Sequence, residues 1–340
     1  FFFFLQSSIY HSIFRKNHLF YPILKILRTE KGINYNYVIN DNIVIVNEGG
    51  KELVHKTVQD FLNEANLLFH IIKSSKGTFP APEIEKFMDE IHCYKVKEKS
   101  QEKADIKIVI HDMRTGMTPS LGFSIKSQLG SNSTLLNSSK MTNFTYCIEN
   151  IVLSDANIKK INSSKTKKEV HDRVKEIMSL GGKLNFIKTD DRVFNNNLML
   201  IDSWLPEIIA SLLVTCYTKE TTKIKDLTEI MTKQNPMNYD ITGNTHYYEH
   251  KIKELLVSTA LGMVPHTVWN GQYQANGGYL VVKEDGDVLC YHIYDRNLFE
   301  NFLYNNTKLE SASIKKSKYA KIYKENNELR FKLNLQIRFK

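Results

Sequence analysis

The sequence predicts a mixed fold of the α/β (α+β) class with a β-rich C-terminal region. Two short apolar runs, 106–110 and 121–126, show the side-chain alternation and the polar boundaries of strands. Several longer segments space their apolar residues with the period of an α-helix. From residue 268 onward short β runs predominate, and Asp285-Gly286 between two of them is a strong hairpin signal.

Before these two runs, the sequence predicts a strand or hairpin over 38–46 and then two helices. The first helix covers 52–75, where the apolar residues share one face, and it ends at Gly77. Pro80 and Pro82 open the second, because a proline is tolerated in a first helical turn, and it ends near Ile91.

After the two runs, an extended segment is predicted over 142–153. Helices bounded by glycine, proline or asparagine are then expected over 165–180, 204–217, 221–233, 245–261 and 296–304. Further strands are expected over 278–283, 288–294 and 329–339.

The chain has 340 residues, of which 42% are hydrophobic, enough for a sizeable core in one large domain or two moderate ones. We expect one compact body with three segments. They are an N-terminal segment of uncertain structure (1–50), a core with helical additions (51–265) and a β-rich, basic region (266–340).

The formal net charge is +9, and it is concentrated near the end of the sequence. Residues 301–340 contain ten Lys or Arg against three acidic residues. A basic face of this density suits a polyanion, most simply nucleic acid. A solvated basic surface has the same composition and remains the alternative.

The cysteines and the apolar segments bear on compartment. Cys93, Cys147, Cys216 and Cys290 lie far apart without CxxC spacing, which predicts mostly buried free thiols in a reducing cytoplasm. Residues 1–5 lack the basic flank and the cleavage site of a signal peptide. No apolar run reaches the roughly 18 residues of a membrane-spanning helix, so no membrane association is expected.

The candidate chemistry lies on the two strands at 106–110 and 121–126. Asp105 opens the first strand, and Lys126 lies on the second, where it shares a side with Ser124 and Gln128. An acid at the start of one strand and a lysine on its neighbour can meet at one sheet edge. The pair suits a metal-assisted nuclease, in which the acid holds a divalent cation and the lysine orients or activates the attacking water. Two solvated surface groups are the alternative.

Short hydroxyl and amide side chains crowd the stretch directly after Lys126. Such side chains are typical donors to phosphate oxygens. The residues that we expect to contact phosphates here are Asn132, Ser133, Thr134, Asn137 and Lys140. A polar linker would be similar, but Leu135, Leu136 and Phe144 indicate packing.

The chain resembles the HpaII family of type II restriction endonucleases in the stretch SIKSQLGSNSTLLNSS, followed by TNFTY. It also resembles that family in the segment WNGQYQANGGYLVVKEDGDVLCYHIYDRNLFENFLYNNTKLES and in the ending FKLNLQIRF. The resemblance covers about residues 50–340. It implies a PD-(D/E)xK restriction-endonuclease-like core, Mg²⁺ dependence, cleavage of double-stranded DNA at CCGG and a cognate DNA methyltransferase as functional partner.

The resemblance also implies roles for individual residues. Asp105 matches the first acid of the PD-(D/E)xK motif and Lys126 its lysine, while Ser124 stands where an acid is usual. We expect Asp105 and the carbonyl of Ile125 to bind Mg²⁺, which prefers oxygen ligands. The second metal-binding carboxylate stays open. Its candidates are Glu149, Glu85 and Glu90. The expected catalytic group is Asp105, Ser124, Lys126, Gln128 and Glu149.

Recognition of CCGG needs Arg or Lys for guanine O6 and N7, and an acceptor for cytosine N4. The block 268–310 concentrates such groups beside turns, and we expect its amides Gln272, Gln274 and Asn276 to be among the candidate base readers. Contacts with DNA are expected from Trp269, Asn270, Lys283, Arg296, Lys308 and Lys315. A homodimer is the simplest way to cut both strands of a palindrome.

Two other functions fit parts of the sequence. His246, Glu249 and His250 form the H-x-x-E-H pattern of inverted zinc proteases, but no third-ligand motif is recognisable and a five-residue pattern is weak. A catalytically inactive, sequence-specific DNA-binding protein would keep the basic region. The presence of both Asp105 and Lys126 favours the enzyme.

Overall fold

The structure is a computed structural model, and it describes residues 23–75, 79–94, 103–113, 115–129, 132–164, 166, 168–219, 221–286, 288–292 and 296–340. The chain divides into two compact units. The first unit contains Phe1–Ser133 and Tyr273–Phe299, and the second contains Thr134–Gln272 and Glu300–Lys340. The expected region 266–340 is therefore divided between both units.

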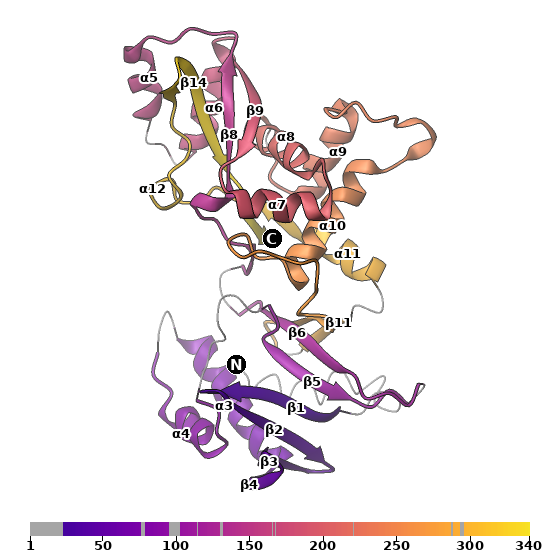
Figure 1. Cartoon of the computed structure of the whole chain (residues 1–340). Helices are drawn as coiled ribbons and strands as arrows, with labels where there is room; N and C mark the ends of the chain where they lie inside the picture. Colours follow the sequence, from indigo (N-terminus) through magenta and orange to yellow (C-terminus); the bar gives the residue numbers. More distant parts are fainter. Residues whose placement is uncertain are drawn as a thin grey trace. The chain divides into compact units, whose positions relative to one another are not determined.

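An eight-stranded sheet forms the first unit, in the order β11-β10-β6-β5-β1-β2-β3-β4 (Figure 1). Neighbouring strands are antiparallel except β6 and β10, which are parallel. The strands are β1 (Ile23–Glu30), β2 (Ile33–Asn40), β3 (Ile43–Glu48), β4 (Lys51–Thr57), β5 (Ile106–Ile110), β6 (Ser120–Ser127), β10 (Gly278–Val282) and β11 (Val288–His292).

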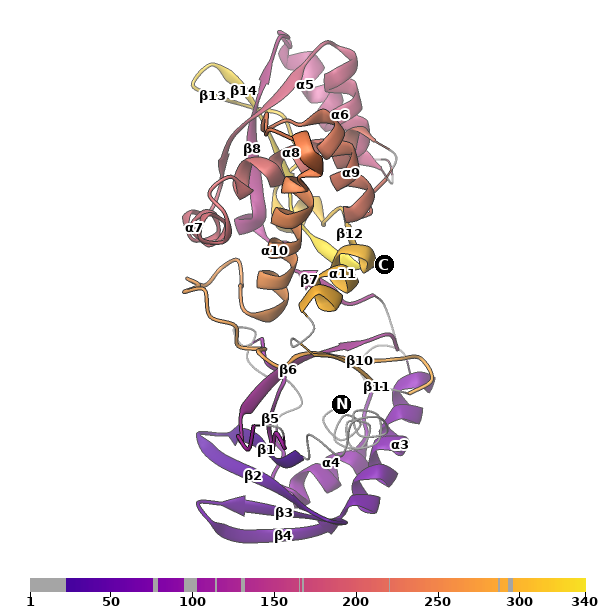
Figure 2. The same cartoon turned by 90° about the vertical axis from the view of Figure 1, so that its right-hand side faces the viewer.

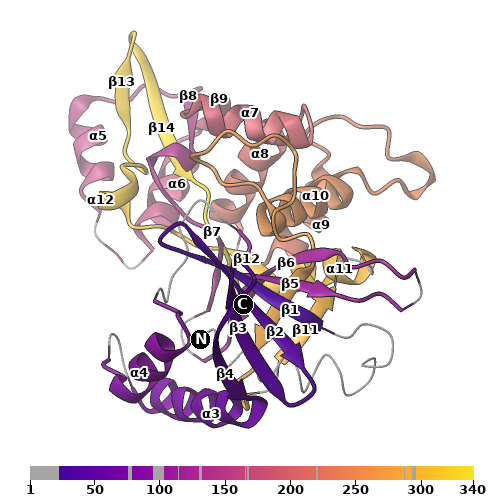
Figure 3. The same ribbon diagram turned by 60° about the horizontal axis from the view of Figure 1, so that its bottom comes forward.

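Two helices, α3 (Val58–Ser74) and α4 (Pro82–Glu90), cover one face of this sheet, as Figures 2 and 3 show. Phe61 of α3 and Phe87 of α4 meet edge to face with ring centroids 5.2 Å apart. Both belong to the buried cluster that includes the sheet residues Tyr37 and Ile108. The core of the first unit therefore lies between the sheet and these helices.

Residues 52–75 are not one helix, so the prediction for this segment is wrong in its first part. Residues 51–57 form β4, which pairs with β3, and α3 begins only at Val58. Thr57 caps α3 through a capping box, because its hydroxyl accepts the Asp60 N–H while the Asp60 carboxylate accepts the Thr57 N–H. The predicted stop at Gly77 lies outside the described residues.

The second unit combines helices with a four-stranded sheet, β13-β14-β8-β9, and a three-stranded sheet, β12-β15-β7. Its strands are β7 (Thr134–Leu136), β8 (Asn143–Glu149), β9 (Lys183–Thr189), β12 (Thr307–Leu309), β13 (Tyr323–Glu325), β14 (Glu328–Asn334) and β15 (Ile337–Phe339). The Tyr146 hydroxyl of β8 donates to the Ala210 carbonyl of α8 at 2.9 Å, which joins the four-stranded sheet to the most apolar helix.

The helices of the second unit are α5 (Asp155–Asn162), α6 (Glu169–Ser179), α7 (Arg192–Ile201), α8 (Leu205–Thr218), α9 (Ile224–Gln234), α10 (Tyr247–Leu261), α12 (Ile314–Ser317) and the short 3₁₀ helices η1 (Lys140–Thr142) and η2 (Thr242–Asn244). In α11 (Arg296–Asn306), the boundary between the units follows Phe299.

Most elements expected after residue 75 are confirmed within one to four residues at their ends, including α4, β5, β6, α8, α9, α10 and the β10–β11 hairpin. The predicted extended segment 142–153 is shorter, because β8 ends at Glu149 and Ser154 already caps α5. The predicted strand 329–339 is two strands, β14 and β15. The elements that were not predicted include β1, α5, β9, α7, β12 and β13.

Within the described residues, no single helix is long and apolar enough to cross a membrane. The helices α7 and α8 reach that length and composition only together, and they are bent by 103° at the break between them.

Candidate active site

The pairing of β5 with β6 brings the predicted acid and lysine to adjacent strands. Ile106 is the ladder partner of Phe123, yet the Asp105 N–H also donates to the Phe123 carbonyl at 2.8 Å. Two successive residues therefore face Phe123, which is the arrangement of a β-bulge.

The Asp105 carboxylate is fixed by β6 and is exposed on its other side. Its Oδ2 accepts the Ile125 N–H at 2.7 Å and the Ser124 hydroxyl at 3.2 Å. The N–H and the C=O of one strand residue point toward the same neighbouring strand. Because the Ile125 N–H points to Asp105, the Ile125 carbonyl faces the same side. A carboxylate and a carbonyl oxygen on one side of a strand are donors of the kind that a hard divalent cation prefers.

Lys126 lies beside this carboxylate, with its Nζ 5.2 Å from the ring centroid of Tyr279 on β10. Tyr279 is itself buried and meets Phe299 edge to face at 5.2 Å. Burial lowers the pKa of Lys126, and the nearby Asp105 carboxylate partly offsets the shift. Lys126 thus lies beside an aromatic ring and a carboxylate, and because of its burial it loses its proton more easily than an exposed lysine.

Sequence reasoning missed Lys103, a second cation at this site. Burial, together with the charge of Lys126, lowers the pKa of Lys103 to about 8, while Asp105 acts in the opposite sense. Two lysines therefore share one carboxylate, and this surplus of positive charge suits an anionic phosphate group. The signal was available, because Lys103 precedes Asp105 by two residues.

The other expected catalytic residues are distributed over both units. Gln128 is exposed just after β6, where its N–H donates to the Val282 carbonyl at 2.9 Å. Glu149 lies in the second unit at the end of β8 and accepts a hydrogen bond from the Asn185 amide. On α4, Glu85 is exposed and Glu90 pairs with Lys56 at 2.6 Å. These contacts single out none of the acids as the second metal-binding carboxylate.

The expected phosphate contacts begin in the first unit and continue into the second. Asn132 is exposed, and Ser133 donates its hydroxyl to the Ser127 carbonyl at 3.2 Å. Thr134 opens β7, and beyond that strand Asn137 and Lys140 are exposed. Within this segment Asn132, Asn137 and Lys140 are exposed, while Leu135 and Leu136 are buried.

The predicted recognition block contains both exposed and engaged side chains. The Trp269 indole N–H donates to the Gln272 carbonyl at 2.8 Å, and the Asn270 side-chain oxygen accepts the Gln272 N–H at 3.1 Å. Lys283 pairs with Asp285 at 3.2 Å. Arg296 is exposed at the start of α11, and Lys308 lies in β12 opposite Arg338.

Two amides of this block, Gln274 and Asn276, were expected among the candidate base readers, but their side chains bind the protein backbone. They lie in the first unit, where their side-chain oxygens accept backbone N–H groups of Lys103 and Gly122 at 2.8 and 2.7 Å. Both partners lie within two residues of Asp105 or Ser124, so these amides belong to the surroundings of the candidate site.

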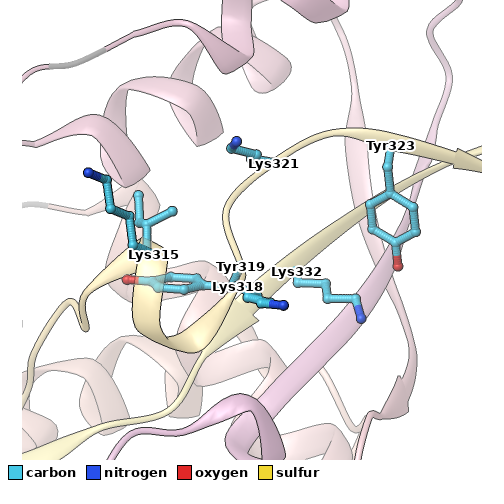
Figure 4. A pocket seen from close by; sticks show the side chains of 7 residues that line it. Lys315, Lys318, Tyr319, Lys321, Tyr323 and Lys332 are labelled. Atoms are coloured by element: carbon cyan, nitrogen blue, oxygen red, sulfur yellow. The ribbon is translucent and has the colours of Figure 1, made fainter.

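A pocket of ≈ 440 Å³ in the second unit gathers part of the basic C-terminal region (Figure 4). It is lined by Ile314, Lys315, Lys318, Tyr319, Lys321, Tyr323 and Lys332. Lys332 is neutralised by Asp190, 2.6 Å away. Lys315, Lys318 and Lys321 are exposed, so the rim of the pocket is positively charged.

The H-x-x-E-H segment lies at the start of α10. His246 is largely exposed and lies 4.0 Å from Glu249, whose carboxylate pairs with Lys253 at 2.6 Å. Across the part of the chain that the structure describes, no three His, Cys, Asp or Glu side chains come together as a metal-binding group. The acid of the pattern is thus engaged in an ordinary helical ion pair.

The described fold is of the expected mixed α/β class. A family profile described as HpaII restriction endonuclease matches residues 8–339. The chain is 47% identical over 323 residues to the type II restriction enzyme HpaII of Haemophilus parainfluenzae, which corresponds to 94% of this chain and 88% of that protein. No solved structure gives a significant match.

The chain therefore belongs to the HpaII restriction endonuclease family. It is a site-specific endonuclease, as the resemblance in its sequence implied.

Proposed function

We propose that this protein is a type II restriction endonuclease that hydrolyses phosphodiester bonds of double-stranded DNA at CCGG in a Mg²⁺-dependent reaction. The observation that carries the proposal is that Asp105, directly before β5, lies beside the Ile125 backbone and Lys126 of β6. The strand pair matches the PD-(D/E)xK pattern, with Ser124 in the place of the second acid. Type II enzymes of this kind generally use a divalent metal ion.

Asp105 and the carbonyl of Ile125 would hold the Mg²⁺ ion. When bound, the ion stabilises the negative charge that develops on the phosphate. Ser124 positions Asp105 through its 3.2 Å hydrogen bond to Oδ2. Few protein ligands are needed, because Mg²⁺ usually keeps several waters.

Lys126 orients the water that attacks phosphorus in line, and it supplies a second positive charge to the phosphate. Because the pKa of Lys126 is lowered, its neutral amine forms at a lower pH than that of an exposed lysine. The neutral amine can accept a proton from that water. Gln128 and one carboxylate, with Glu149, Glu90 and Glu85 as the candidates, would complete the group. Lys103 adds positive charge on the same side.

The DNA backbone would be held by the polar residues after β6 and by the basic rim of the second unit. The first set is Asn132, Ser133, Thr134, Asn137 and Lys140. The second is represented by Lys315 and Lys318, which line the pocket of Figure 4. Contacts with bases or sugars are proposed for Trp269, Asn270, Lys283, Arg296 and Lys308.

Replacing Lys315 and Lys318 together by alanine is expected to weaken DNA binding on all sequences alike. Each lost phosphate contact lowers the slope of log K against log salt by roughly one, so a decrease of about two is expected. The measurement is duplex affinity in Ca²⁺ across a salt series. Lys225 and Lys233, exposed on α9, provide a matched double variant. An unchanged slope for Lys315 and Lys318 would show that this rim faces solvent.

A homodimer that works in the cytoplasm beside a cognate DNA methyltransferase completes the proposal. Two active sites related by a two-fold axis cut both strands of a palindromic site in one binding event.

The test of this function is digestion of a plasmid of known sequence by the purified protein, with and without Mg²⁺, followed by mapping of the ends. Fragments bounded by CCGG in Mg²⁺ only are expected. Fragments bounded by another sequence would refute the specificity. Intact plasmid together with specific duplex binding would identify the alternative, an inactive DNA-binding protein.

A further inference from the structure

We infer that Gln274 and Asn276 are positioning residues that hold the strands bearing the catalytic pair, and that they do not read bases. The inference rests on the proposed function, since it assigns these amides to the Asp105–Lys126 site. It replaces the expectation that every amide of the 268–310 block faces DNA.

The two side-chain oxygens hold both strands beside the catalytic residues. Gln274 Oε1 accepts the N–H of Lys103 at 2.8 Å, two residues before Asp105. Asn276 Oδ1 accepts the N–H of Gly122 at 2.7 Å, two residues before Ser124. Residues more than 150 positions away in sequence thus fix the segment just before β5 and the first half of β6.

The loop 274–277 also packs its backbone directly on β6. The Gly277 N–H donates to the Gly122 carbonyl at 2.7 Å. A Cβ on Gly122 would lie 2.3 Å from the Gln274 carbonyl oxygen, and a Cβ on Gly277 would lie 2.6 Å from the Phe123 ring. This close approach leaves the loop little freedom to swing toward a DNA groove.

Asp105 needs such support because it lies at the end of its strand. The pairing of β5 with β1 reaches only to Lys107, so Asp105 is held on the β6 side. The hydrogen bond from the Lys103 N–H to Gln274 fixes the chain two residues before Asp105. Bidentate base recognition by an amide uses both its oxygen and its NH₂ group. In Gln274 and Asn276 the oxygens are already engaged by the protein.

The experiment compares variants that keep or remove the acceptor at each position. Gln274→Glu and Asn276→Asp keep an oxygen acceptor, whereas Gln274→Met and Asn276→Leu remove it at similar size. We expect each acceptor-free variant to lose on the order of 10–100-fold in single-turnover cleavage, since a misplacement of about 1 Å has such an effect. The acceptor-keeping variants should stay within about threefold of wild type.

Three further measurements separate positioning from base reading and from unfolding. Duplex affinity in Ca²⁺ and discrimination between CCGG and sites with one changed base should both stay at wild-type values. Hydrogen exchange of the Lys103 amide should accelerate in Gln274→Met. Gln234→Met, which removes an exposed amide at the end of α9, serves as the control.

Reduced discrimination with weaker CCGG binding would assign base reading and overturn the inference. Wild-type cleavage by both acceptor-free variants would also overturn the inference. Cleavage by the acceptor-keeping variants as slow as that of the acceptor-free ones would overturn it as well. Absence of cleavage by the wild-type protein would instead refute the proposed function. In that case the exchange of the Lys103 amide still decides whether Gln274 holds the strand.

Discussion

Replacing Asp105 by asparagine is expected to lower single-turnover cleavage by roughly 10³-fold or more, because metal assistance contributes several kcal/mol and each 1.36 kcal/mol is tenfold in rate. Asparagine keeps the shape and one oxygen for the Ile125 N–H, so β5 and β6 should remain paired. It removes the charge that attracts the cation. Duplex binding in Ca²⁺ should change far less than cleavage, because phosphate and base contacts supply most of the affinity.

The matched control is Asp89→Asn, which removes an exposed carboxylate of α4 in the same unit. It should cleave at the wild-type rate. Cleavage by Asp105→Asn within tenfold of wild type would remove Asp105 from the site and leave the strand pair without a metal-binding role.

The second large effect is expected for Lys126→Met, which should lower cleavage by roughly 10²–10⁴-fold, the range for loss of a group that transfers a proton or stabilises charge. Methionine keeps an apolar stem over the Tyr279 ring. Lys107→Met, on the exposed side of β5, is the control and should leave the rate unchanged.

The same variant should not destabilise the fold. Burial lowers the pKa of Lys126, so its charged form is less favourable in the folded state than in the unfolded state. This penalty is present at pH values below the unfolded pKa of lysine, and methionine removes it. We therefore expect an equal or higher Tm at pH 7 together with lost cleavage. A marked fall in Tm would show that the loss of activity reflects unfolding.

The strands of the candidate site were predictable because their signals are local. The β-branched run of β5, the alternation in β6 and the turn between them need no information from elsewhere in the chain. The hairpin at Asp285-Gly286 is predictable for the same reason.

The division of 52–75 into a strand and a helix was missed, although the local signal existed. Thr57 and Asp60 have the spacing of a capping box, which places the helix start at Val58. The apolar residues of β4 happened to extend the helical pattern backward, because Val54 lies four residues before Val58.

The roles of Gln274 and Asn276 could not be predicted, because their partners are distant in sequence. Amides beside a Gly-Gly pair suggest a turn or a DNA contact equally well. Only the parallel pairing of β10 with β6 brings this loop to Lys103 and Gly122. The second metal-binding carboxylate depends on tertiary placement in the same way.

The central claim is that Asp105 holds the metal ion of the reaction, and the most direct test is Mn²⁺ binding followed by electron paramagnetic resonance. Mn²⁺ shares the preference of Mg²⁺ for oxygen ligands. In the presence of duplex DNA, the wild-type protein should bind Mn²⁺, Asp105→Asn should bind it at least tenfold more weakly, and Asp89→Asn should match wild type. Wild-type Mn²⁺ affinity in Asp105→Asn would contradict the account.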